Sequence, residues 1–513
     1  MIGPETAESS VRAALATEPL AVIDIGSNSG RVDVVRVDST GHLDVLDTLG
    51  TPLRLVHELA NGGNLGEPVI ERTVLALRGF QAIARGAGAQ RTIAIATAAV
   101  REAANGEAFV ARLRRETGLD IEVISGEMEA RYGFLGAVYG IPVEHGIVID
   151  IGGGSMQVAH FRDRCLLRTW SLPLGALRLS DRFLLTDPPT TAEIRRLQEH
   201  VRALQEHAML PTLAADEQIV GTGGTIRTLA RIDRGSQTYP IHRLHGYVIE
   251  RRALVSMGSR LAGQTAAART RTPGLGASRF DSIVGGAFCA LVTLDTLRGT
   301  SILVSGQGLR EGVALAQARA TLPPPAEVRA SAIAALGGRF ATWSRRSAEQ
   351  RALFASTLLD ALDPGVSPEL RETLLHAARI LDVGRSVDIY NLHEHTLNIV
   401  SSADLSGFSH RAIALLGALV RLSGKDSAGL KQFAPLVGQS DQASLVRLAA
   451  ILALADALVA QAPPVQPAGV ICHRTNNGLA LAAPWLVSWP LQSAIRRIQQ
   501  IFAVAIQTST DHA

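Results

Sequence analysis

Four short glycine-rich loops contain the residue types in this sequence that suit chemistry on an anion. They are Asp24–Ser29, Asp150–Ser155, Gly221–Thr225 and Ser305–Gly312. A glycine-rich turn after a strand lets backbone N–H groups converge on an anion, because a Cβ would block the approach. One such loop fits any tight turn, since a lone Gly-x-Gly is a weak signal. Their joint occurrence predicts a phosphate-binding cleft.

Two aspartates precede the glycines of the first two loops. Carboxylates at the positions of Asp24 and Asp150 suit Mg²⁺ held against phosphate oxygens. The alternative is that each aspartate only caps its turn. We predict Asp24 and Asp150 as metal ligands. The predicted phosphate-binding residues are those of three loops: Ser27, Asn28, Ser29, Gly152, Gly153, Gly154, Ser155, Gly223, Gly224 and Thr225.

The elements that must position these loops form an internal repeat. Each Asp-Ile-Gly segment ends an apolar strand and opens a run of alternating residues typical of a β-meander. The two segments lie 126 residues apart, a spacing that indicates a duplicated domain. Two lobes with facing strand-end loops predict a cleft between them.

Proline-rich stretches divide the rest of the chain. Pro323–Pro325 precedes a long helical part, and Pro463, Pro464 and Pro467 precede a last part of mixed strand and helix. We therefore expect an α/β protein with four domains. They are lobe I (17–135), lobe II (136–318), a helical domain (326–462) and a small α+β domain (466–513).

Length and composition set the broad class. The chain has 513 residues, 47% hydrophobic and 19% charged, which predicts several globular domains and excludes disorder, collagen and a disulfide scaffold. The most apolar stretch, Leu445–Ala460, is interrupted by Arg447 and Asp456, so we expect no membrane span. The first residues lack the pattern of a signal peptide.

Charge and cysteine use point to the compartment. Cys165, Cys289 and Cys472 form no CxxC pair, which favours the reducing cytoplasm. The net charge is +3, and Lys425 and Lys431 are the only lysines. Arginine suits bidentate contacts to phosphate, although genomic base composition explains its excess equally well. We expect no nucleic-acid partner.

In its combination of motifs the chain resembles the exopolyphosphatase and guanosine pentaphosphate phosphohydrolase family, a branch of the actin-like ATPase superfamily. The resemblance covers about the first 315 residues and extends into the helical part. The resembling blocks are IDIGSNSGR (23–31), ATAAVREAAN (96–105), ISGEMEARYGF (124–134), VIDIGGGS (148–155), GTGGTIRTLA (221–230), TPGLGASRFDSIVGG (272–286), VSGQGLREGV (304–313) and NLHEHTLNIVSSADLSGF (391–408).

The resemblance implies duplicated actin-like (ribonuclease H-like) lobes, an all-α HD-like domain and Mg²⁺-dependent removal of terminal phosphates. It implies that Glu129 is the base for the attacking water and a further metal ligand, and that Arg101 contacts phosphate. It also implies a homodimer, and K⁺ is a further candidate cofactor. Read from the residues alone, Glu129 is a helix carboxylate just after a strand and Arg101 follows a strand end. A solvated glutamate and a surface arginine fit the same patterns.

Two departures from the family pattern affect the metal predictions. Met156-Gln157 replaces the Thr-Glu that usually follows the second loop, so we expect weaker or altered Mg²⁺ binding. In the helical domain the expected His-Asp pair is Leu381-Asp382, and a later histidine is Ser423. We expect no binuclear metal site there, although His376, His393, His395 and Asp404 remain.

We weigh four functions. The first is an exopolyphosphatase, whose polyanionic substrate would follow arginines such as Arg371, Arg379, Arg385 and Arg411. The second is a guanosine pentaphosphate (pppGpp) phosphatase with the same site and a purine pocket. A kinase or chaperone would need an adenosine pocket, and a non-catalytic sensor fits the degenerate sites but not intact Glu129. The apolar segments within Leu479–Leu491 fit either a dimer interface or the last core.

Overall fold

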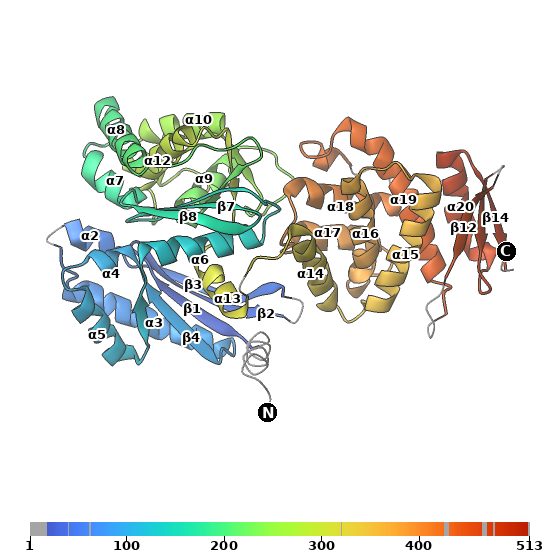
Figure 1. Ribbon diagram of the computed structural model, residues 1–513, viewed down its shortest axis with the longest axis horizontal. Helices are drawn as coiled ribbons and strands as arrows, with labels where there is room; N and C mark the ends of the chain where they lie inside the picture. The colour runs from blue at the N-terminus through green and yellow to red at the C-terminus, as the bar shows by residue number, and fades with distance from the viewer. Residues whose placement is uncertain are drawn as a thin grey trace. The chain divides into compact units, whose positions relative to one another are not determined.

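The computed structural model describes residues 18–38, 41–60, 63–319, 321–424, 430–463, 469–475 and 478–510. Pro464 and Pro467 of the second predicted linker lie outside these residues. The chain forms two compact units (Figure 1). The first contains the residues up to Thr238 and Leu244–Val328, and the second contains Tyr239–Arg243 and the residues from Arg329 onward.

Lobe I of the first unit is a five-stranded sheet covered by helices. Its strand order is β3 (Leu43–Pro52), β2 (Ser29–Val37), β1 (Leu20–Ile25), β4 (Arg91–Ala96) and β5 (Ile121–Val123). Strands β1 to β3 form an antiparallel meander, and β4 and β5 run parallel to β1. The helices are α2 (Leu55–Ala60), α3 (Glu67–Gly86), α4 (Ala98–Glu102) and α5 (Gly106–Thr117). Helix α3 buries Val69, Leu77 and Phe80 at helical spacing, which fixes it against the sheet.

Lobe II repeats this arrangement with one more strand. Its order is β10 (Val248–Glu250), β11 (Ser301–Val304), β9 (Gln218–Thr222), β6 (Gly146–Ile151), β7 (Met156–Arg162) and β8 (Cys165–Leu172). Its helices are α7 (Ala176–Phe183), α8 (Thr191–His207), α9 (Gly223–Gly235), α10 (Arg251–Ala262), α11 (Ala266–Arg269) and α12 (Ile283–Thr296). Twelve of the residues of α12 are buried, so this apolar helix forms the centre of the lobe.

The duplication seen in the sequence is present in the register of the strands. Asp24 of β1 lies opposite Arg31 of β2, and Asp150 of β6 lies opposite Gln157 of β7. The two loops close with the same bond: the N–H of Gly26 donates to the carbonyl of Ser29 (3.2 Å), and that of Gly152 donates to Ser155 (3.0 Å). The predicted meanders therefore present their loops in equivalent ways.

Two helices that connect the lobes cross at very close range. They are α6 (Gly126–Tyr139) and α13 (Leu309–Ala318). A Cβ on Gly136 would lie 1.8 Å from the carbonyl oxygen of Gly308, and one on Gly312 would lie 1.8 Å from that of Tyr132. Only glycine permits this approach, which brings residues from both helices to one cavity.

The second unit is helical, with a small sheet at its C-terminal end. Its helices are α14 (Pro325–Gly338), which begins in the first unit, α15 (Arg345–Leu362), α16 (Pro368–Ile380), η1 (Leu381–Ser386), α17 (Leu392–Ser402), α18 (His410–Ser423), η2 (Leu430–Phe433), α19 (Gln439–Val459) and α20 (Ser488–Phe502). The sheet order is β12 (Ile471–Thr475), β13 (Gly478–Ala482) and β14 (Ala505–Ser509). Leu479, Leu481 and Leu491 are buried in the same core as the helices. These three leucines therefore belong to the core, whereas Val487 and Trp489 of the same segment are exposed.

Helix α19 is, among the described residues, the one helix long and apolar enough to cross a membrane by length and composition. Half of its apolar window is buried inside the protein, and its Asp456 pairs with Arg351 at 2.7 Å. Both observations fit the core helix of a folded domain.

Candidate active site

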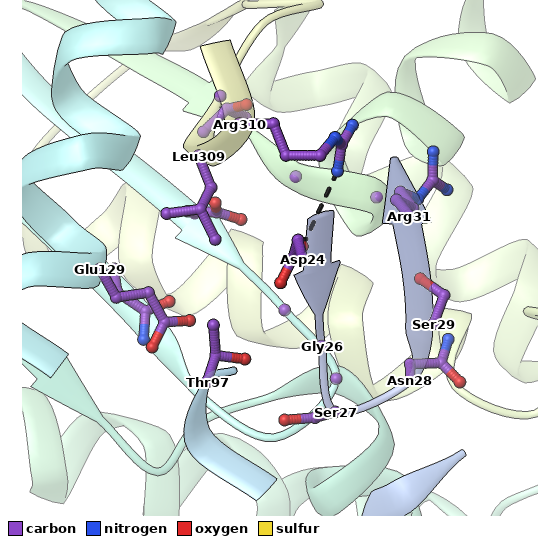
Figure 2. Close-up of a pocket in the computed structure, with 18 of the residues that line it drawn as sticks. Asp24, Gly26, Ser27, Asn28, Ser29, Arg31, Thr97, Glu129, Leu309 and Arg310 are labelled. Carbon is purple, nitrogen blue, oxygen red and sulfur yellow. Dashed lines mark ion pairs between the residues drawn. The ribbon is translucent and has the colours of Figure 1, made fainter. Parts of the chain in front are cut away.

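The glycine-rich loops of the two lobes meet around a cavity of about 110 Å³ (Figure 2). A Cβ on Gly153 would lie 2.9 Å from the Cβ of Asn28, and one on Gly154 would lie 2.8 Å from Oγ of Ser27. Any side chain at these glycines would push the lobes apart. Of the predicted phosphate-binding residues, the cavity is lined by Ser27, Asn28, Ser29, Gly152, Gly153, Ser155, Gly223 and Gly224.

Two predicted phosphate-binding residues do not line the cavity. Gly154 lies behind it, where its carbonyl oxygen accepts a bond of 2.8 Å from Arg178 Nε. Thr225 lies one residue further along α9 and is 1% exposed, so its hydroxyl does not reach the cavity. Gly154 therefore supports the loops through its bond from Arg178, and Thr225 is not among the residues that line the cavity.

The two predicted metal ligands both line the cavity. Burial raises the pKa of Asp24 to about 6, although Arg310 and Arg31 lower it, and burial raises the pKa of Asp150 as well. Oδ1 of Asp24 is buried without a hydrogen-bond partner, and Oδ2 lies 3.7 Å from Nη1 of Arg310. Gly223 has a φ of +82°, and a Cβ there would lie 2.0 Å from Oδ1 of Asp150. The backbone at Gly223 therefore lies so close to the carboxylate of Asp150 that no side chain fits between them.

These aspartates fit a Mg²⁺ ion only in part. Among the described residues, no group of three His, Cys, Asp or Glu side chains could hold a metal ion. Mg²⁺ usually takes one or two carboxylates and completes its shell with water and substrate phosphates. The unpartnered Oδ1 of Asp24 and the nearby Asp150 fit that pattern. Glu129, the third predicted ligand, pairs with Arg101 instead.

Glu129 lies in the first turn of α6, which Ser125 caps by accepting a bond from the N–H of Met128. Its Oε2 lies 3.4 Å from Nη1 and Nη2 of Arg101, a residue of α4 whose Nη1 also donates to the carbonyl of Ile124 at 2.6 Å. Burial raises the pKa of Glu129 to about 8, although Arg101 lowers it. A buried carboxylate with a pKa in this range is suited to accept a proton from water.

Four arginines that were not predicted as site residues also line the cavity. They are Arg31, Arg227, Arg279 and Arg310. Burial lowers the pKa of Arg31 and Arg279 to about 10, and their mutual repulsion adds to this effect. Arg310 donates to Asp33 at 2.6 Å, and this contact keeps its pKa above the usual value despite burial. Each of the four arginines lies within one of the sequence blocks that resemble the family. Those blocks were interpreted as loops, so the arginines in them were not predicted as site residues.

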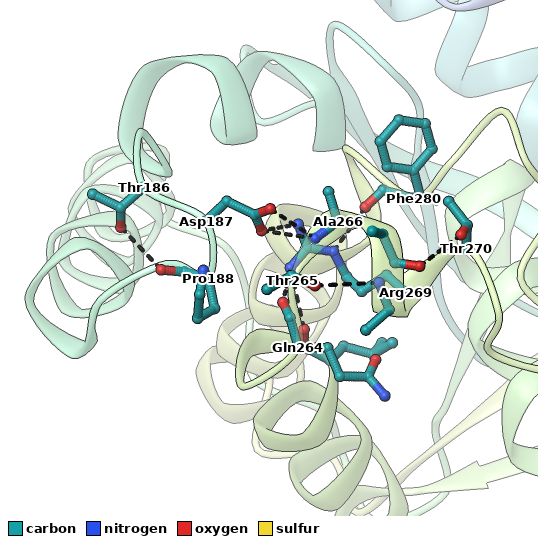
Figure 3. A network of polar contacts seen from close by, with 12 residues as sticks. Thr186, Asp187, Pro188, Gln264, Thr265, Ala266, Arg269, Thr270 and Phe280 are labelled. Atoms are coloured by element: carbon teal, nitrogen blue, oxygen red, sulfur yellow. Dashed lines mark hydrogen bonds and ion pairs between the residues drawn. The ribbon is translucent and has the colours of Figure 1, made fainter.

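The segment that carries Arg279 is held by a buried network (Figure 3). Arg269 is 6% exposed and donates to the carbonyl of Phe280 (3.0 Å) and of Gln264 (2.6 Å), and it pairs with Asp187 (3.4 Å). Asp187 also accepts a bond of 2.7 Å from the N–H of Ala266 at the start of α11. This network fixes the backbone next to Arg279.

Gln157 occupies a closed position beside the second loop. It is 4% exposed, and its Nε2 donates to Oγ of Ser155 (2.8 Å) and Oγ of Ser171 (3.3 Å). These two bonds from the amide order the loop. Because the amide is neutral, it places no charge beside Asp150. Met156 is fully buried against Cys289.

The second unit pairs the charged residues that the sequence analysis considered. Arg351 is 2% exposed at its side chain and bridges Asp382 and Asp456, while Arg385 also pairs with Asp382. The four arginines suggested as a polyanion track each pair with carboxylates: Arg371 with Asp360, Arg379 with Glu349, Arg385 with Asp382, and Arg411 with Glu369 and Asp441. Local pairing leaves these four side chains little net charge for a polyanion.

The remaining histidines of this unit have separate surroundings. His376 lies 3.4 Å from Oε1 of Glu372 and packs on Phe408, and Leu381 is fully buried. His395 lies 3.9 Å from Asp388, and Asp404 pairs with Arg243. The hydroxyl of Ser423 donates to the carbonyl of Val420.

Comparisons with known proteins give a consistent family. Residues 34–320 match the Ppx/GppA phosphatase family, and residues 328–492 match domain III of Ppx/GppA phosphatases. Exopolyphosphatase 1 of Mycobacterium tuberculosis is 30% identical over 305 residues, which are 58% of this chain and 87% of that protein. Exopolyphosphatase 2 of the same organism is 28% identical over 322 residues, 59% of this chain and 100% of that protein.

Solved structures agree. The Ppx/GppA family member of Aquifex aeolicus is 31% identical with a TM-score of 0.52 and covers 58% of this chain and 97% of its own. An exopolyphosphatase from Cytophaga hutchinsonii is 25% identical with a TM-score of 0.53, over 58% of this chain and 96% of its own. The prediction of a mixed α/β, actin-like fold is confirmed. The HD-like character of the helical part stays a prediction.

Proposed function

Because the chain belongs to the Ppx/GppA phosphatase family, we propose that it hydrolyses the terminal phosphate of inorganic polyphosphate with Mg²⁺. The family makes it a phosphatase, and relatives named exopolyphosphatase support this substrate. The observation that carries the proposal is the set of buried arginines that line the cleft. Within the described residues, Arg31, Arg227 and Arg279 form no ion pair, although carboxylates of the cleft lie near enough to interact with each of them. Their guanidinium groups are therefore suited to bind the phosphates of a polyanion directly.

Glu129 is the proposed base of the reaction. A water oxygen attacks the terminal phosphorus while the bond from this phosphorus to the bridging oxygen breaks. The proton of the water passes to Glu129, and the bridging oxygen keeps the electron pair and becomes the new end of the chain. Arg101 holds the Glu129 carboxylate in place through its contacts at 3.4 Å.

The aspartates and arginines bind the substrate. Asp24 and Asp150 would hold Mg²⁺, which when bound neutralises phosphate charge. Arg31, Arg227 and Arg279 contact the phosphates that follow the terminal one. Arg310 is already paired with Asp33 and Asp24, so it orients Asp24.

The first experiment measures phosphate release by purified protein with Mg²⁺ from long-chain polyphosphate and from pppGpp at matched terminal-phosphate concentration. We expect faster release from polyphosphate, suppressed by salt because the binding is largely ionic. Preference for pppGpp would replace the proposed substrate by the nucleotide. Release from neither substrate, with tight binding of either, would indicate a sensor.

Glu129→Gln tests the base. The substitution keeps the side-chain shape and removes the basic oxygen, so turnover should fall roughly 10²–10⁴-fold with polyphosphate binding unchanged. Glu107→Gln is the matched control, because Glu107 is an exposed carboxylate in the first turn of the neighbouring helix α5 and lines neither cavity. Unchanged turnover in folded Glu129→Gln would remove Glu129 from this role.

A further inference from the structure

A second cavity, of about 880 Å³, lies beside the catalytic cleft. We name it the side cavity. One wall is formed by Arg101 and Glu102 of α4 and by Gly126 and Glu127 at the start of α6, and the other by residues 166–173 in and after β8. Ser155 lines both cavities, and Arg101 lines the side cavity while its guanidinium contacts Glu129 of the cleft. Ser155 and Arg101 therefore form the wall between the two spaces, beside the proposed base.

The cleft has two chemically different sides. Figure 2 shows Glu129 and Arg31 on opposite sides of Asp24. The neighbours differ as well. Glu129 interacts with Arg101 and with the two aspartates, whereas Arg31, Arg227 and Arg279 interact with other arginines in addition to carboxylates of the cleft. The side cavity adjoins the Glu129 side.

The geometry of phosphoryl transfer assigns a role to each side. The attacking and leaving oxygens lie roughly in line with phosphorus, so water enters from the Glu129 side and the chain leaves toward the arginines. The new orthophosphate carries the water oxygen and so forms on the Glu129 side. A chain still bound to the arginines fills the other side, and the product needs a separate way out.

We propose that the side cavity is the exit for orthophosphate and the access path for water. The inference rests on the proposed function. Its lining fits a weakly held anion: Ser155, Thr169 and Ser171 offer hydroxyls, and Arg101 and Arg168 are offset by Glu102 and Glu127. This lining differs from the side of the cleft where Arg31, Arg227 and Arg279 gather. It would pass an anion without trapping it.

Two features keep this path defined. Arg168 lies over the ring of Trp170 at 4.8 Å, and Trp170 Nε1 donates to the carbonyl of Ala208 at 3.0 Å, which fixes the outer wall. At the junction, Gln157 donates to both Ser155 and Ser171. A neutral amide there does not repel a departing phosphate, whereas a carboxylate would.

The test separates cleavage from release. Acid quench measures cleavage of polyphosphate in the first turnover, and a fluorescent phosphate-binding reporter measures free orthophosphate in the same mixture. Thr169→Trp narrows the side cavity in its middle. We expect cleavage in the first turnover to remain within about twofold of the parent, and release to lag by roughly tenfold or more, as when product release limits turnover.

Two further variants secure the result. Leu167→Trp narrows the same cavity at a side chain that is 58% exposed, so folding tolerates it. Leu46→Trp, on the equivalent strand β3 of lobe I, is the control and should show no lag. Release that keeps pace with cleavage in both folded cavity variants would overturn the exit. Failure of the parent protein to cleave polyphosphate would instead overturn the proposed function itself, and the exit with it.

Discussion

At the scale of single residues, burial more than any neighbour sets the charge state of the cleft carboxylates. It is the largest cause of the raised pKa values of Asp24, Asp150 and Glu129. Arginines lower each of them without cancelling the effect. A cation bound between Asp24 and Asp150 would favour their charged forms.

The arginine set makes a prediction about substrate affinity. Arg31→Gln removes one charged contact to phosphate, worth roughly 1.5–3 kcal/mol, so KM for polyphosphate should rise roughly tenfold or more with a smaller change in kcat. The salt dependence of binding should also become shallower by about one charge. Steady-state kinetics at several salt concentrations measure both quantities.

The matched control for this prediction lies on the same strand. Arg36→Gln changes an exposed arginine of β2 that pairs with Asp44 outside the cleft. It should leave KM and the salt dependence unchanged. Equal effects of the two variants would argue against a specific contact of Arg31 with the chain.

At the scale of elements, glycines at helix starts and crossings decide how closely the elements around the cavity approach one another. Gly223 begins α9 with a left-handed backbone and leaves 2.0 Å between the position of a Cβ and Oδ1 of Asp150. Gly136 and Gly312 likewise leave no room for a Cβ where α6 crosses α13. A substitution at any of these glycines would therefore change the geometry of the cavity.

Gly223→Ala should therefore abolish most activity. The added Cβ displaces Asp150, and the left-handed backbone costs roughly 1–2 kcal/mol for a residue other than glycine. Turnover with polyphosphate and the urea midpoint measure the two effects. Gly235→Ala, at the other end of α9 where a Cβ meets open space, should retain activity. If Gly223→Ala retained full turnover, the tight contact with Asp150 would not matter for catalysis.

At the scale of the whole molecule, the two units differ in what they contain. The residues of the candidate active site all belong to the first unit, and the second unit has its own continuous core. Within that core Arg351 holds Asp382 and Asp456 together. Asp382 therefore has a guanidinium as its partner where the family resemblance led us to consider a metal.

Arg351→Met should destabilise the second unit by roughly 3–5 kcal/mol, because it removes the buried guanidinium that pairs with Asp456 and leaves Asp382 with Arg385 alone. Chemical unfolding followed by tryptophan fluorescence measures the change. Arg371→Met breaks a more exposed pair with Asp360 and should cost about 1 kcal/mol or less. Equal stability of the two variants would show that the buried bridge contributes little.

The local sequence by itself determined much of the first unit. An apolar strand that ends in Asp-Ile-Gly is a recognisable local pattern, and glycine permits the tight turn that follows it. The loops at Asp24 and Asp150 and the duplication, 126 residues apart, could therefore be predicted from the sequence. The short helix α4, which carries Arg101, is not apparent in the sequence, because so few residues leave no clear period.

Tertiary structure decided which residues face each other across the cleft. Arg31, Arg227, Arg279 and Arg310 come from four distant segments, and no local pattern distinguishes them from other arginines. Likewise, only packing showed that Thr225 and Gly154 face away from the cavity and that the arginines of the second unit are paired with carboxylates. The physical reason is that charge and burial depend on neighbours far along the chain, whereas backbone conformation depends mainly on neighbours in sequence.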